Sequence, residues 1–120
     1  MVRRLALAAS IAFGLPVGAQ AATLYTSFLN VGAGDSLNCG VVNASTKSRE
    51  VTLEVLGISG TVISGGPATL APGTGAGQSV ASTESPTHCR FTVKGSAKTI
   101  RGRACVLTPG GSCFVALPAQ

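Results

Sequence analysis

Short runs in which apolar and polar side chains alternate dominate the sequence after residue 21, and they constrain the fold more than any other feature. In the run 50–56, for example, Val51, Leu53 and Val55 alternate with polar residues. Successive side chains of a β-strand point to opposite faces, so this period of two predicts a strand with one buried face. After residue 21, no window of a dozen residues keeps the period of about 3.6 that marks an amphipathic helix. The sequence therefore predicts an all-β domain.

Eight such runs follow one another, separated by clusters of turn-forming residues at a spacing of about ten residues. They cover 24–29, 37–43, 50–56, 61–64, 78–81, 89–94, 99–107 and 113–117. Many short strands at this spacing predict an antiparallel β-sandwich of about 7–8 strands. The stretch 65–87 is rich in Gly, Pro, Ser and Thr and is expected to form loops joined by one poor strand.

The first 21 residues have the composition of a secretory signal peptide. Arg3 and Arg4 precede an apolar run at 5–17, and Ala19-Gln20-Ala21 forms a small-x-small cleavage site. The apolar run is shorter than the roughly 20 residues that span a bilayer. We expect a signal-peptide helix at 1–21 and one mature domain at 22–120, with no membrane span after cleavage. The signal peptide predicted at 1–21 is of a bacterial type, so we expect a bacterial protein that is secreted or periplasmic.

All four cysteines lie in the predicted mature domain, where an even number in an exported chain predicts disulfides. Cys39 shares the core face of its run with Leu37 and Val41. Cys89 likewise falls on the apolar face of its own run. Two core-facing cysteines about fifty residues apart predict a Cys39–Cys89 bond between two sheets.

The other two cysteines flank a turn. Alternation assigns Cys105 to the solvent face, whereas Thr108-Pro109-Gly110-Gly111 is a strong turn signal. A hairpin folded about Pro109 is expected to place Cys105 directly opposite Cys113. The second predicted disulfide is therefore Cys105–Cys113, across the last hairpin.

Basic residues cluster in the second half of the chain. Without Arg3 and Arg4, seven basic residues face four acidic ones, a net charge of +3. Five of the seven are Arg90, Lys94, Lys98, Arg101 and Arg103. If the runs 89–94 and 99–107 pair as a hairpin, these residues form one basic face for an acidic envelope component or a protein partner. The cluster has no outward aromatic residue, so nucleic acid is not an expected ligand.

The four residues Gly34-Asp35-Ser36-Leu37 match the Gly-Asp-Ser-Leu signature of a family of serine esterases. A serine nucleophile needs an adjacent base, and His88 is the only histidine. The nearest acidic residue, Glu84, stands four positions before His88, which does not match the Asp-x-x-His motif of such esterases. His88 and Cys89 are neighbours on a strand and point to opposite faces, and no metal-ligand spacing is present. The sequence therefore predicts no enzyme, no metal and no cofactor.

Three motifs give the chain a resemblance to a group of known proteins. They are Leu37-x-Cys39-x-Val41-x-Asn43, the Pro72-Gly73 turn, and Cys89-x-Phe91-x-Val93-x-Gly95 followed by Ile100-Arg101. In these motifs the chain resembles small exported bacterial proteins of unassigned function that have an immunoglobulin-like β-sandwich. The resemblance covers most of 22–120. It implies an immunoglobulin-like fold and carries no catalytic residue.

Together these features predict an exported, non-enzymatic β-sandwich module that acts through surface contacts, as a binding or accessory protein. An alternative is a subunit of a surface assembly that pairs its edge strands with a neighbour. A further alternative is an esterase that uses Ser36 as its nucleophile.

Overall fold

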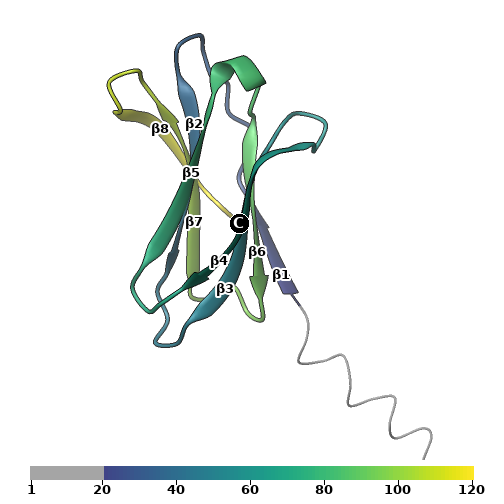
Figure 1. Cartoon of the computed structure of the whole chain (residues 1–120), viewed down its shortest axis with the longest axis vertical. Helices are drawn as coiled ribbons and strands as arrows, with labels where there is room; N and C mark the ends of the chain where they lie inside the picture. Colours follow the sequence, from purple (N-terminus) through teal and green to yellow (C-terminus); the bar gives the residue numbers. More distant parts are fainter. Residues whose placement is uncertain (1–20) are drawn as a thin grey trace, which may run out of the picture.

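The computed structural model describes residues 21–120, which form eight strands and one short 3-10 helix (Figure 1). The predicted signal peptide lies outside the described residues, apart from Ala21, where the first strand begins. The elements are β1 (Ala21–Tyr25), β2 (Ser36–Asn43), β3 (Arg49–Leu56), β4 (Val62–Leu70), β5 (Gly75–Ala81), η2 (Ser82–Glu84), β6 (His88–Lys94), β7 (Ile100–Leu107) and β8 (Cys113–Pro118).

The strands form two antiparallel sheets of four strands each. Sheet A has the order β1-β6-β3-β4, and sheet B has the order β5-β2-β7-β8. The two sheets lie as two layers in Figure 1, with η2 joining β5 of one layer to β6 of the other. The predicted all-β class with antiparallel strands is confirmed.

The core lies between the two sheets and is built from the apolar positions of the alternating runs. Sheet B contributes Leu37 and Val41, and sheet A contributes Val51 and Val55. Each of these four residues is at most 2% exposed. Each fully buried side chain of this size contributes about 1.5–3 kcal/mol relative to an exposed one. Alternation in the sequence therefore identified the buried faces of β2, β3 and β6 correctly.

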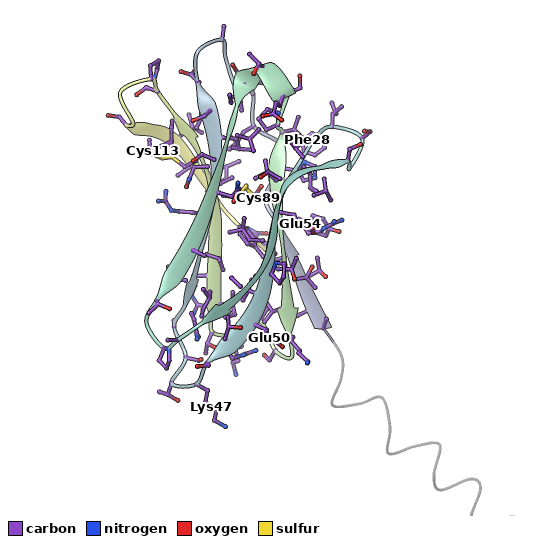
Figure 2. The ribbon with its side chains drawn as sticks, in the orientation of Figure 1. Phe28, Lys47, Glu50, Glu54, Cys89 and Cys113 are labelled. Carbon is purple, nitrogen blue, oxygen red and sulfur yellow. A yellow bond between two sulfur atoms is a disulfide. The ribbon has the colours of Figure 1, made fainter. Side chains whose placement is uncertain are left out.

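The Cys39–Cys89 disulfide joins β2 of sheet B to β6 of sheet A, with the two Cα atoms 5.7 Å apart. Both residues are 0% exposed. Figure 2 shows Cys89 between the two layers. The predicted bond between the sheets is confirmed.

The Cys105–Cys113 disulfide is also confirmed, but its predicted register is wrong. Cys105 lies opposite Ala116, and Cys113 lies opposite Leu107, with a bulge between Val106 and Leu107. The bond therefore runs diagonally across the hairpin. Cys105 lies on the outward face of β7 with Arg101 and Arg103, as predicted, because its neighbours Ala104 and Val106 face the core. It is nevertheless 0% exposed, whereas Cys113 is exposed, so the expected exposure of Cys105 is wrong.

The stretch 65–87 is more regular than the sequence predicts. β4 continues to Leu70 through Gly65, Gly66 and Pro67, and β5 already begins at Gly75. Glycine and proline weaken a central strand but are tolerated at a sheet edge, and β4 and β5 are both edge strands. A hydrogen bond of 2.7 Å from Gln78 Nε2 to Ser64 Oγ connects the two edges.

The end of the chain returns to its first strand. Tyr25 and Gln120 exchange two backbone hydrogen bonds, of 3.0 and 2.9 Å, so the segment after β8 meets the end of β1. In Figure 1 the C-terminus accordingly lies between the two layers. This contact connects sheet B to sheet A on the side opposite β4 and β5.

Candidate functional site

The structure separates the basic residues that the sequence places on one face. β6 belongs to sheet A and β7 belongs to sheet B, so the two strands do not form a hairpin. Arg90 and Lys94 therefore lie on the outer face of sheet A, and Arg101 and Arg103 lie on the outer face of sheet B. The prediction of a single basic face is wrong, because the connection that contains Lys98 crosses from one layer to the other.

On sheet A the positive charges are neutralised by β3. Arg90 Nη2 lies 2.8 Å from Glu54 Oε1, and Lys94 Nζ lies 3.4 Å from Glu50 Oε2. Figure 2 shows both glutamates along β3. The hydrogen bond with Glu54 raises the pKa of Arg90, so the guanidinium stays charged. Surface pairs of this kind contribute at most about 1 kcal/mol to stability, but they leave this face nearly neutral.

On sheet B the arginines have no acidic partner. Within residues 21–120 neither Arg101 nor Arg103 forms an ion pair, and both are exposed. Arg101 Nη1 donates to the backbone oxygens of Lys98 at 2.8 Å and Ile100 at 3.3 Å. Arg103 Nη1 lies 3.9 Å from Cys113 Sγ. The fold therefore orients both guanidinium groups while leaving most of their N–H donors available to a ligand.

These two arginines border a hollow of about 480 Å³ on the outer face of sheet B. Its floor is formed by the backbone of Gly40 in β2 and of Gly75 and Gly77 in β5. Gly40 and Gly77 are direct partners in the β2–β5 ladder, so two side-chain-free positions meet at its centre. We call this hollow, with its glycine floor and its arginine border, the glycine groove.

The two ends of the glycine groove differ in chemistry. At one end, Asn38 Nδ2 donates to Ser79 Oγ at 2.9 Å, which forms a polar cross-strand pair. At the other end, Val42 is 45% exposed and lies opposite Gly75. The groove thus offers cationic donors along one side, a polar end, and a flat floor of bare peptide groups.

The structure places Ser36 of the esterase signature and His88 in different sheets. Ser36 begins β2 and pairs with Ala81 and Leu107 in sheet B. His88 pairs with Leu56 in sheet A, and its Nδ1 lies 2.8 Å from Thr87 Oγ1. No hydrogen bond between Ser36 and His88 is present in the part of the chain that the structure describes.

His88 is only 7% exposed and lies at one end of sheet A. Its ring centroid is 4.6 Å from that of Phe28 and 6.5 Å from that of Tyr25. Figure 2 shows Phe28 at this end, near the β3–β4 turn. Burial, and then the charge of Arg90, lower the pKa of His88. Both causes favour the neutral imidazole.

Residues 21–120 contain neither a metal-binding cluster nor a membrane-spanning helix. No group of three or more His, Cys, Asp or Glu side chains there could hold a metal ion. No helix in that range is long and apolar enough to cross a membrane.

The sequence did not single out Gly40 and Gly77. The sequence feature that could have drawn attention to them is their position inside strands, where glycine is unfavourable. Neither residue breaks the alternation of its neighbours, because a glycine adds no side chain to the pattern. Only the pairing of β2 with β5 brings the two together.

Comparisons with protein-family models, curated proteins and solved structures give no match for this chain. The structure itself defines the class: an all-β protein of two antiparallel sheets with two disulfides. Two disulfides in a domain of this size fit an oxidising extracellular or periplasmic environment.

Proposed function

We propose that the protein is an exported, non-enzymatic binding module of the bacterial envelope or the extracellular space, and that its contact surface is the glycine groove. The ligand is anionic. The observation that carries this proposal is the contrast between the two sheets. Arg90 and Lys94 on sheet A have glutamate partners, whereas Arg101 and Arg103 on sheet B have none among the described residues.

Charge explains how such a surface would act. An arginine presents planar N–H donors that match carboxylate, sulfate and phosphate oxygens. Arg101 and Arg103 are exposed, so their attraction for a ligand is screened by salt over about 8–10 Å. The proposal therefore predicts a moderate, salt-dependent affinity for anionic ligands.

A matched pair of double variants tests this function. Arg101→Gln with Arg103→Gln, and Arg90→Gln with Lys94→Gln, each remove two positive charges from one sheet face. We expect the first variant to elute from a dextran sulfate matrix at clearly lower salt than the second, which should behave almost as the original protein. Equal losses in the two variants would contradict the groove and indicate attraction by net charge alone.

The proposed absence of enzymatic activity has its own test. Purified protein should not hydrolyse short acyl esters above the rate of buffer, because within residues 21–120 Ser36 and His88 lie in different sheets and no hydrogen bond joins them. Hydrolysis that disappears in Ser36→Ala would instead support an esterase.

We also propose an immunoglobulin-like relationship for the fold. β2 lies beside β5 and β3 beside β6, as the B–E and C–F strands do in immunoglobulin domains. The Cys39–Cys89 bond joins the second and sixth strands, like the B–F disulfide of antibody domains. β1, β4 and β7, however, each lie in the sheet opposite the one that their counterparts A, D and G occupy. An experimental structure that keeps these pairings would support the relationship.

A second candidate function is assembly through strand pairing at β8. This strand lies at the edge of sheet B, and Val115 on it is 37% exposed. An exposed apolar edge can pair with another chain, and a lysine there opposes such pairing. Assembly predicts larger species in sedimentation velocity as the concentration rises, and their loss in Val115→Lys. A monomer at all concentrations would exclude this function.

A further inference from the structure

The three glycines of the groove floor differ in whether the fold leaves space for a side chain at their positions. At Gly75 a Cβ would come within 2.6 Å of Val41 O, so this position excludes a side chain. At Gly40 the nearest atom to a Cβ would be Asn38 Oδ1 at 3.8 Å, and at Gly77 it would be Cys39 O at 3.5 Å. These are ordinary contact distances. Gly40 and Gly77 could therefore each carry a side chain without a clash.

Backbone conformation does not require glycine at these two positions either. Among residues 21–120, the glycines with positive φ are Gly34, Gly60, Gly65, Gly73, Gly95 and Gly111. Gly40 and Gly77 are not among them and lie inside extended strands. A glycine in a strand interior costs about 0.5–1 kcal/mol relative to alanine. The directly paired glycines thus weaken the β2–β5 ladder with no conformational or steric reason within the fold.

A glycine inside a strand commonly marks a bulge, a tight bend, or a place where a ligand or another backbone approaches closely. The β2–β5 register runs without a shift through Gly40 and Gly77, which favours the close approach. A second copy of this chain is a poor occupant of the groove. The outward residues of sheet B around it include two arginines and no carboxylate, so two such faces would repel each other. Nucleic acid is also disfavoured, because none of the residues that line the groove is aromatic and no base could stack there.

We propose that the glycine groove binds an acidic polysaccharide, with the flat face of a sugar ring lying on the Gly40–Gly77 pair. This inference rests on the proposed function and names its ligand class. The carboxylates of the sugar meet Arg101 and Arg103. The ring hydroxyls meet the polar pair of Asn38 and Ser79. The bare peptide groups of the floor let the ring approach more closely than any side chain would allow.

The dimensions of the sheet agree with one extended chain of sugars. Arg101 and Arg103 are two residues apart on β7 and project from the same face, so their Cα atoms are separated by about 7 Å. β7, β2 and β5 are consecutive strands, which places the arginine-bearing strand about 10 Å from β5. A single polymer lying along β2 would contact both arginines from one side and the glycine floor from below.

The test compares two polymers with similar charge and different backbones. Polygalacturonate and poly-L-glutamate both carry one carboxylate per unit, and dextran is the uncharged control. Binding of each is measured by calorimetry to the original protein and to three variants. These are Gly40→Ala with Gly77→Ala, Arg101→Gln with Arg103→Gln, and Gly66→Ala. Gly66 is a matched control, because it lies in β4 of sheet A with nothing within 4 Å of its Cβ position.

We expect polygalacturonate to bind at least about tenfold more tightly than poly-L-glutamate, and dextran not to bind. The glycine double variant should lose about tenfold in affinity for polygalacturonate while its melting temperature stays equal or rises. Gly66→Ala should bind normally. The single Gly77→Ala variant tests the same loss of affinity. It changes only the edge strand β5 and leaves β2 intact, so it perturbs the β2–β5 ladder less.

The possible failures are distinguishable. Equal binding of the two polymers that depends on the arginines would overturn the polysaccharide inference and leave an anionic ligand in place. Unchanged affinity in the glycine variants would overturn the role of the floor. No binding of either polymer, or binding indifferent to the arginine variant, would overturn the proposed function as well.

Discussion

The ring of Phe91 occupies the space in which a side chain at position 102 would stand. A Cβ on Gly102 would lie 2.7 Å from Phe91 Cε2 and 2.8 Å from Cδ2. Phe91 is 0% exposed and belongs to β6, while Gly102 belongs to β7 of the opposite sheet. The fit between these two residues therefore helps to set how closely the two sheets approach at this point of the core.

Gly102→Ala should therefore destabilise the protein by about 1–3 kcal/mol, because overpacking forces side chains or backbone to shift. Denaturant unfolding followed by circular dichroism measures this change. Phe91→Leu alone should also destabilise, but combining it with Gly102→Ala should cost less than the sum of the two single changes. Simple additivity of the two effects would contradict the proposed contact.

Asn43 should be intolerant of substitution because its side chain is 0% exposed and fully hydrogen-bonded. Its Nδ2 donates to Lys47 O at 2.8 Å and Leu70 O at 2.9 Å, and its Oδ1 accepts from Ser45 N and Oγ. Asn43→Ala should cost about 1–3 kcal/mol, since it removes the buried hydrogen bond to Leu70 O together with the bonds to Lys47 and Ser45. Asn43→Asp should cost more, because it places a carboxylate against the carbonyl oxygens of Lys47 and Leu70. Thermal unfolding of both variants is the measurement, and an aspartate variant as stable as the original would contradict this assignment.

The two disulfides should differ in their resistance to reduction. Cys39 and Cys89 are both 0% exposed, whereas Cys113 is open to solvent. A thiol reductant needs access to a sulfur, so mild reduction followed by alkylation and mass spectrometry should label Cys105 and Cys113 first. The folded spectrum should persist at that stage. Labelling of all four cysteines at the same rate would show that global unfolding precedes reduction.

The energetic consequences of losing each bond should differ as well. The Cys39–Cys89 bond closes a sequence separation of 50 residues and the Cys105–Cys113 bond one of 8. Chain-entropy estimates give stabilisation of about 4 and about 2.5 kcal/mol respectively.

Stability should fall as the pH is lowered through the ordinary range of histidine titration. Burial and Arg90 lower the pKa of His88 in the folded state, so the unfolded chain takes up a proton more readily. The contribution of His88 is fully present above the unfolded pKa of about 6.5 and is lost below it. Melting temperatures at about pH 7.5 and about pH 5 should differ less in His88→Gln than in the original protein. An unchanged difference in the variant would assign the pH dependence to other groups.

The sequence predicted the strands well where one face of a run is wholly apolar. Val51, Leu53 and Val55 identify β3, and the same reasoning placed Cys39 and Cys89 on facing sheets. The alternation of apolar and polar residues can be read within a single strand. The apolar face of each of these strands packs against the opposite sheet, so the alternation alone predicts which of their side chains are buried.

The sequence failed where the outcome depends on which strands become neighbours. The residues 94–98 contain turn formers that suit either a hairpin or a crossing between sheets, and only the complete strand order decides between them. That choice separated Arg90 from Arg101. Similarly, the solvent-facing prediction for Cys105 missed a burial that alternation along β7 alone does not reveal.

The most direct test of the glycine groove is a nuclear magnetic resonance titration of the protein with a short galacturonate oligomer. We expect the amide signals of Gly40, Gly77, Arg101 and Arg103 to shift progressively, while those of Thr52 and Thr92 on the outer face of sheet A stay in place. Shifts centred on sheet A, or no shifts on sheet B at saturating oligomer, would contradict binding at the glycine groove.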